Sequence, residues 1–250
     1  MTKLLKNKLV KFILFVLVSV STANAWSANR DTELISAADK GNFPLVKKIL
    51  DTEQIEQEEL NTAFLAAIKK GNAAIVERFI QAGVDVNLRA ENSYTPLMQT
   101  ARDGRDQVVE ILLTAGADVN AVSEEDDTAL ILAAEKDRRK VIAALLAANA
   151  NVNAKRSNGM TALLLAAQEG HQQTIQALVA AKADVNYQLE NGATALMLAA
   201  QHGHLGAVYS LIAANADLNL KASNGMTAMM LANHYRYKEV IDLLKKAGAK

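Results

Sequence analysis

Four consecutive carboxylates, Glu124–Asp127, form the densest group of side chains that could hold a cation. Their spacing lacks the D-x-D-x-D-G pattern of a calcium loop. The chain has no Cys, which excludes disulfides, thiolate metal sites and cysteine nucleophiles. The G-x-S-x-G, P-loop and H-E-x-x-H motifs are also missing from the sequence. We therefore predict that the acidic run is solvated and that the chain has no catalytic residue.

Two of the four histidines, His202 and His234, are the remaining candidates for metal ligation. A zinc site in a protein takes three or four ligands. The positions near these histidines add only Glu169 and Tyr235. We therefore predict no metal site, no cofactor and no enzymatic activity.

A threonine recurs at a fixed spacing through most of the chain. Each occurrence is followed by a small residue or Pro and then by an apolar residue. The copies that lie 33 residues apart are Thr62, Thr95, Thr128, Thr161, Thr194 and Thr227. An earlier copy with a shortened connection begins at Thr32. Self-similarity at a fixed period predicts a repeat architecture.

The residues around each threonine keep the same register. Residues 161–171 read TALLLAAQEGH and residues 194–204 read TALMLAAQHGH. A second apolar helix follows, as at 108–113, and the unit ends in Ala-Asp-Val-Asn or a close variant. The threonine hydroxyl is suited to cap the first helix, and a glycine is suited to end it in a left-handed conformation. Each unit is too small to bury its own apolar faces, so it must stack on its neighbours.

This unit resembles the ankyrin repeat, whose first helix usually reads T-P-L-H-x-A-A-x-x-G-H and whose exit usually reads G-A-D-V-N. The resemblance covers nearly all of the chain after the N-terminal segment, with about seven repeats that start near residues 31, 61, 94, 127, 160, 193 and 226. It implies an all-α fold, an ankyrin-repeat α-solenoid with short β-hairpin tips. It also implies that His171 and His204 are structural.

Several positions depart from the family pattern. The His that usually follows T-P-L is replaced by an apolar residue. Asp137-Arg138 stands where Gly-His is usual, and Arg236-Tyr237 stands there in the last repeat. The first copy has a polar exit over 51–59, as expected of a capping repeat.

The N-terminus has the order of a secretory signal peptide. Four lysines, the last of them Lys11, precede an apolar run over 12–20 and the small residues Ala23 and Ala25. The run is about half of the roughly 20 apolar residues that a membrane helix needs. We therefore predict a signal peptide over 1–25 that is cleaved after Ala25, an ankyrin array over 26–250, no membrane span after cleavage, and a periplasmic or secreted location.

Charge excludes one class of partner. The full chain carries 27 basic and 27 acidic residues, and loss of the four N-terminal lysines would leave 23 basic residues against 27 acidic ones. A mildly acidic chain without a stripe of Lys and Arg is a poor match for nucleic acid. We expect a protein partner, no nucleic acid, and a monomer.

Ankyrin arrays usually bind through their hairpin tips and the concave face of the first helices, so the resemblance also implies where a partner lies. The residue before each Thr, and the pair seven and eight positions after it, vary while the surrounding framework repeats. We predict that these exposed positions, together with one residue of the last repeat, bind the partner: Tyr94, Arg102, Asp127, Lys136, Met160, Glu169, His202, His234, Tyr235 and Tyr237.

The leading hypothesis is an exported protein–protein interaction scaffold that binds, protects or inhibits one partner. An alternative is a secreted effector that captures a protein of another organism. An enzyme hidden in the array is a remote third alternative, which the failed search for motifs disfavours.

Overall fold

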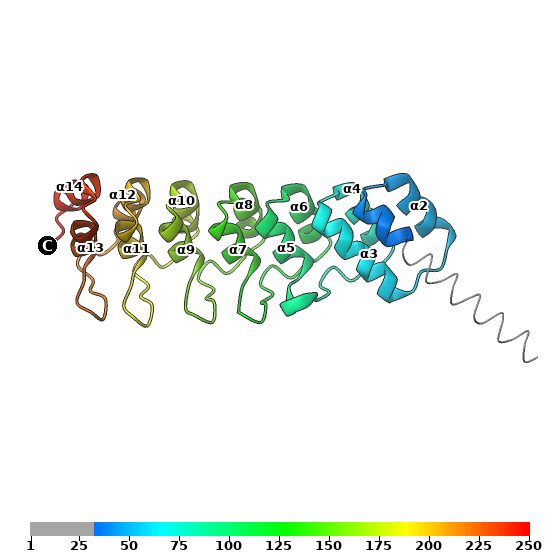
Figure 1. Cartoon of the computed structure of the whole chain (residues 1–250), viewed down its shortest axis with the longest axis horizontal. Coiled ribbons are helices and arrows are strands. Elements are labelled where there is room, and N and C mark those ends of the chain that lie inside the picture. Colours follow the sequence, from blue (N-terminus) through cyan, green and yellow to red (C-terminus); the bar gives the residue numbers. More distant parts are fainter. Residues whose placement is uncertain (1–32) are drawn as a thin grey trace, which may run out of the picture. The chain divides into compact units, whose positions relative to one another are not determined.

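The computed structural model describes residues 33–250, and the predicted signal peptide over 1–25 lies outside this range. The chain divides into two compact units, the first ending at Val84 and the second running from Asp85 to Lys250. Both units are built from paired antiparallel helices, and Figure 1 labels them along the chain. The expected all-α fold is confirmed.

In the first unit, helical residues 33–39 are followed by α2 (Phe43–Thr52), α3 (Gln57–Lys70) and α4 (Ala73–Gln81). Phe64 of α3 and Phe79 of α4 are fully buried, and their rings meet edge to face at 6.1 Å between centroids. This aromatic pair joins the two helices, because such contacts add to the free energy of apolar burial.

The capping role predicted for Thr62 is wrong. α3 begins at Gln57, five positions earlier, so Thr62 lies inside the helix and its hydroxyl donates to the Glu58 carbonyl at 2.8 Å. The preceding residues Gln-Glu-Glu-Leu-Asn contain no Gly or Pro that would force a turn. Good helix formers therefore extend the helix upstream to the position that other repeats use for a loop.

In the second unit, each repeat contributes a first and a second helix. The first helices are α5 (Pro96–Asp103), α7 (Ala129–Glu135), α9 (Ala162–Glu169), α11 (Ala195–Gln201) and α13 (Ala228–Tyr235). The second helices are α6 (Asp106–Thr114), α8 (Arg139–Ala147), α10 (Gln172–Ala180), α12 (Leu205–Ala213) and α14 (Lys238–Lys246). Successive first helices pack on one another, successive second helices do the same, and the connecting loops of this unit project from one side (Figure 1).

The predicted threonine caps are confirmed for every first helix of the second unit. Each hydroxyl accepts a hydrogen bond from the backbone N–H three residues later, at 3.2–3.3 Å. The capping residues, all at most 5 % exposed, are Thr95, Thr128, Thr161, Thr194 and Thr227. A buried cap satisfies an N–H group that would otherwise lose its hydrogen bond to water.

The loops between repeats are hairpin turns rather than strand ladders. Each is closed by one backbone hydrogen bond across four residues, as from Ser123 N to the Asp127 carbonyl at 3.0 Å. Within residues 33–250, Lys155 and Thr161 form the isolated β-bridge. The expected β-hairpin tips are therefore present as turns. Neighbouring tips are also bonded to each other, as where Ser223 N donates to the Asn191 carbonyl at 2.8 Å.

The repeated exit Asp-Val-Asn forms a ladder of hydrogen bonds between repeats. Asn153 is typical: its Oδ1 accepts from Asp184 N at 2.9 Å, and its Nδ2 donates to the Lys182 carbonyl at 3.5 Å. The acceptor half of this pattern recurs at Asn87, Asn120, Asn186 and Asn219. An Asn side chain can both donate and accept, so one residue type satisfies the backbone groups of the next repeat.

A glycine at the end of a first helix meets two requirements: it adopts a left-handed backbone conformation, and it leaves room for a side chain of the next repeat. Gly170 has a φ of +76°, where a side chain costs about 1 kcal/mol or more. A Cβ built on it would lie 2.6 Å from Nδ1 of His204 in the next repeat. The His204 ring crosses the glycine and Nε2 donates to the Gln168 carbonyl at 2.9 Å. His171 makes the equivalent bond to the Glu135 carbonyl at 3.1 Å, so both histidines have structural contacts.

Where the usual Gly-His pair is replaced, other side chains maintain contact with the neighbouring repeat. Arg138 replaces the His and donates from Nε to the Arg102 carbonyl at 3.0 Å, while its side chain crosses Gly104. Asp137 replaces a Gly at a φ of +51°, and its Oδ1 accepts from the Thr174 hydroxyl at 2.7 Å. Tyr237 lays its ring across Gly203, where a Cβ would lie 2.6 Å from the ring.

We predict that Gly170→Ala lowers the free energy of unfolding by about 2 kcal/mol or more, because it adds a collision with the His204 ring to the left-handed strain. Gly225→Ala is the matched control, since Gly225 has a φ of +82° but no atom within 4 Å of the place that an added Cβ would take. Urea denaturation followed by circular dichroism measures both variants. Equal losses would show that the ring contact does not matter.

Candidate functional site

The candidate site is the surface that the first helices and hairpin loops of the second unit share, called the hairpin face below. Near the C-terminal end of each first helix lies an exposed side chain, seven positions after the capping Thr in the first case and eight in the others: Arg102, Lys136, Glu169, His202 and Tyr235. We call these five residues the exposed row. They change in charge and size from repeat to repeat while the capping threonine of the same helix stays constant.

Arg156 holds together the part of the hairpin face around α7. From the loop before α9, its guanidinium donates from Nε to Oδ1 of Asp127 and from Nη2 to Oε2 of Glu135, the latter at 2.7 Å. Asp127 precedes α7 and Glu135 is its last residue, so one side chain bridges both ends of this helix. Two bonds from a planar guanidinium fix geometry as well as charge.

The network extends to both sides of Arg156. The Tyr94 hydroxyl donates to the other Asp127 oxygen, Oδ2, at 3.1 Å. The Arg102 guanidinium carbon lies 5.6 Å from the centre of the Tyr94 ring. Lys136 Nζ lies 2.9 Å from Oε1 of Glu135. The charges here are paired within the protein, and a partner would meet an ordered polar surface.

Burial and charge act together on the titration of this network. Burial raises the pKa of Tyr94, and the nearby Asp127 carboxylate adds to that effect because it opposes a second negative charge. For Glu135, burial works to raise the pKa, but hydrogen bonds and charges from Lys136 and Arg156 together outweigh it and lower the pKa. Burial likewise opposes the charge of Arg156, yet the two carboxylates raise its pKa.

The end of the hairpin face near α11 and α13 has aromatic and imidazole rings instead of ion pairs. His202 stacks on His204 at 5.9 Å between ring centroids, and His234 meets Tyr235 edge to face at 4.8 Å. Tyr235 also stacks on Tyr237 at 6.3 Å. Tyr235 is 46 % exposed, so much of its ring remains available to a partner.

A small hollow of about 230 Å³ lies between α11, α13 and the loops before them. Apolar side chains form much of its lining: Met197, Leu198, Met226 and Leu231. Amide and hydroxyl groups complete it: Asn191, Gln201, Ser223 and Asn224.

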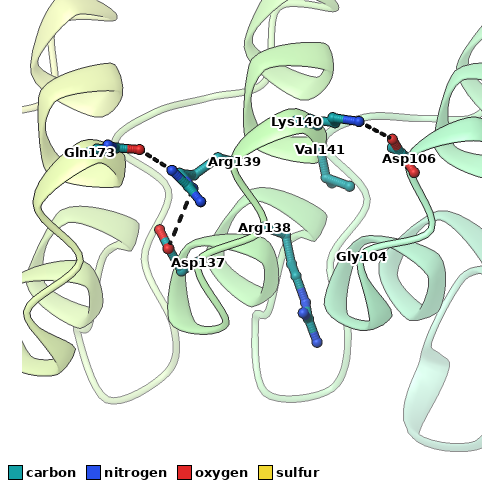
Figure 2. Close-up of a pocket in the computed structure, with 8 residues that line it drawn as sticks. All are labelled: Gly104, Asp106, Asp137, Arg138, Arg139, Lys140, Val141 and Gln173. Carbon is teal, nitrogen blue, oxygen red and sulfur yellow. Dashed lines mark hydrogen bonds and ion pairs between the residues drawn. The ribbon is translucent and has the colours of Figure 1, made fainter.

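A larger depression of about 630 Å³ lies at the start of the second helices, and Figure 2 shows the basic and acidic side chains that line it. Its charges are paired internally: Lys140 Nζ lies 3.3 Å from Asp106 Oδ2, and Arg139 contacts both Asp137 and Gln173. Arg138 is bonded to the Arg102 carbonyl. The lining therefore has three cations and two carboxylates, with the Arg138 guanidinium held by a neutral carbonyl.

The comparison with known families decides the classification. The sequence pattern described as ankyrin repeats (3 copies) matches residues 34–123, 97–188 and 173–250. The chain belongs to the ankyrin repeat family. A search of curated proteins finds no match. Ankyrin repeats are general protein–protein interaction modules and are typically non-enzymatic. The count of about seven repeats stays a prediction.

The residues predicted to bind a partner differ in how exposed they are in the structure. The whole exposed row and His234 are at the surface, as expected. The expected exposure is wrong for Asp127, which is 2 % exposed because it pairs with Arg156 and Tyr94. Tyr94, Met160 and Tyr237 are only partly exposed. Tyr237 also has a framework contact, since its ring packs on Gly203.

The part of the chain that the structure describes was searched for metal-binding groups and for membrane-spanning helices, and it contains neither. Among residues 33–250, no group of three His, Cys, Asp or Glu side chains is placed to hold a metal ion, and this range includes His202 and His234. In the same range, no helix has the length and apolar character needed to cross a membrane.

Arg156 was not among the predicted site residues, although the sequence contains a signal for it. The equivalent positions of the other repeats hold Ala90, Ser123, Leu189 and Ala222. A single large cation among small or apolar residues indicates a specific partner. Neither of its carboxylate partners is close in sequence, so the pairing itself required the fold.

We predict that Arg156→Ala lowers the free energy of unfolding by roughly 3 kcal/mol, because it leaves the buried Asp127 carboxylate without its cation. Lys136→Ala is the control: it removes the exposed partner of Glu135 and should cost at most about 1 kcal/mol. Urea denaturation at neutral pH compares the two. A loss for Arg156→Ala as small as the control would show that the Asp127 pair is not stabilising.

We predict that Glu135 stabilises the fold above its ordinary titration range and loses this contribution in acid. Its pKa is lowered on folding, so the stabilisation is present above the unfolded value near 4.5 and disappears as the pH falls through the folded value. The difference in unfolding free energy between wild type and Glu135→Gln should therefore shrink from pH 7 to pH 3. A difference independent of pH would contradict the ion-pair assignment.

Proposed function

We propose that the chain is an exported scaffold that binds one protein partner through the hairpin face of residues 85–250. The observation that carries the proposal is the exposed row, in which dissimilar side chains lie seven (Arg102) or eight positions (the other four) after the capping Thr on a repeated and hydrogen-bonded framework. A framework of this kind tolerates change in the row, so selection for a partner can act there without disturbing the fold.

Rigidity supports this interpretation. The caps are buried, neighbouring tips are joined by backbone hydrogen bonds, and Arg156 bridges two repeats. A surface already ordered in the free protein has less conformational entropy to lose when a partner binds. Arg and Tyr side chains dominate the energetics of many interfaces, and the row supplies both as Arg102 and Tyr235.

Export rests on the sequence alone, on the lysines, apolar run and Ala23/Ala25 pair that precede the described residues. In the proposed setting the mature protein, a monomer, works in the periplasm or the medium, where it holds, protects or inhibits its partner. Capture of a foreign protein by a secreted form of the chain is the alternative that the same experiment addresses.

We predict that Arg102→Ala/Tyr235→Ala abolishes capture of the partner, because it removes a cation and an aromatic ring from the exposed row. The chain is immobilised and offered the exported fraction of its source cells, and bound proteins are identified by mass spectrometry. A single stoichiometric partner that the double variant loses is the expected result.

The matched control is Arg105→Ala/Tyr209→Ala, which removes the same residue types from the loop before α6 and from α12, where Tyr209 is 58 % exposed. It should keep the partner, and both variants should melt within a few degrees of wild type. Equal loss of the partner in both variants would contradict binding through the hairpin face. A column that stays empty with that fraction but retains a protein from another organism would favour the effector.

A further inference from the structure

The hollow between α11 and α13 differs from the rest of the hairpin face because its lining has no ionisable side chain. Around α7, the positions equivalent to three of the lining residues hold charged side chains instead: Asp127, Glu135 and Arg156. Burying a charge without a counter-charge is costly, so the lining favours an uncharged occupant.

A small residue, Ala193, lines the hollow where the other repeats have a larger one. The residue before each capping Thr is Tyr94, Asp127, Met160 or Met226 in the other repeats, but it is Ala193 before α11. The Leu four positions after the Thr is less buried at the hollow than in the repeats of α7 and α9. Leu132 and Leu165 are 3 % and 5 % exposed, whereas Leu198 and Leu231, which line the hollow, are only partly buried.

The size of the hollow limits what it can hold. At about 230 Å³ it is smaller than the roughly 300–1,000 Å³ of sites for drug-sized ligands. A single apolar side chain is a better match in volume. Two of its walls are Met197 and Met226, and the unbranched Met side chain adapts its shape to an apolar partner.

The rim adds hydrogen-bond donors at fixed places. Asn191 and Asn224 each accept a backbone N–H through Oδ1 at 3.0 Å, from Ala193 and Met226, and this fixes which amide atom is the nitrogen. Neither Nδ2 has a hydrogen-bond partner within residues 33–250. These two donors match the carbonyl oxygens of an extended peptide, whose backbone groups are not used in a helix.

We propose that the hollow binds an uncharged apolar side chain, of the size of leucine, methionine or phenylalanine, from an extended segment of the partner protein. The inference rests on the proposed function and names the chemistry of the partner at this end of the hairpin face. The donors of Asn191 and Asn224 pair with main-chain carbonyls on either side of the inserted side chain.

Methyl NMR of the full chain with ¹³C-labelled methionines tests the proposal. The probes are capped peptides, acetyl-Ser-Gly-X-Gly-Ser-amide, in which X is leucine, alanine or aspartate. The leucine peptide should shift the Met197 and Met226 methyl signals in a saturable way and leave those of Met98 and Met160 unchanged. The alanine and aspartate peptides should bind at least about tenfold more weakly, because a few methylenes in an apolar pocket are worth that much.

Ala193→Met is the decisive variant. It fills the hollow with the residue that Met160 and Met226 already place at the same point of their repeats, so the fold accommodates it. Binding of the leucine peptide should fall at least tenfold, with an unchanged melting temperature. Equal shifts for the three peptides, shifts centred on Met98 or Met160, no shift with the leucine peptide, or binding unaffected by Ala193→Met would each overturn the proposal.

The capture experiment separates this failure from failure of the proposed function. A partner that Ala193→Met retains and Arg102→Ala/Tyr235→Ala loses would refute the hollow as a partner site while leaving the scaffold intact. A wild-type chain that captures no protein would refute the scaffold itself, whatever the peptides do.

Discussion

Each first helix inside the second unit is buried on both flanks by the first helices of its neighbours, and this close approach governs the other features. Ala134, Ala167 and Ala200 are fully buried at the same position of α7, α9 and α11. A larger side chain there would push the helices apart, because protein interiors are close-packed. The polar groups at the ends of these helices then come within reach of the next repeat and must be satisfied by it.

Along the chain, these polar groups remain hydrogen-bonded, although the residue that provides the hydrogen bond changes from repeat to repeat. His171, His204 and Arg138 all donate to a carbonyl of the preceding repeat, although an imidazole and a guanidinium differ in shape and charge. Tyr237 keeps only the packing across a glycine. Arg138, His204 and Tyr237 each pass over a glycine, where a Cβ would lie 2.6–2.7 Å from the crossing side chain.

The hairpin face therefore has two chemical regimes. Around α7, Arg156 and Lys136 are paired with Asp127 and Glu135, so this network gives the surface order. Toward α13, the Tyr235 ring and the hollow beside Leu198 are open and uncharged. A partner would recover apolar burial at this end, while the polar end sets its orientation through hydrogen bonds.

The repeat, the all-α fold, the threonine caps of the second unit and the structural histidines could all be predicted from the sequence. The repeat and its caps depend on contacts at a fixed spacing, which periodicity reveals, whereas the fold and the structural histidines are implied by the resemblance to the ankyrin repeat. The start of α3 could not, because Thr62 matches the pattern while the helix formers before it override the turn. The burial of Asp127 and the opening beside Ala193 also required the tertiary structure. Whether a residue at a variable position is exposed depends on which side chain reaches it from another repeat, and Arg156 reaches Asp127 across 29 positions of the chain.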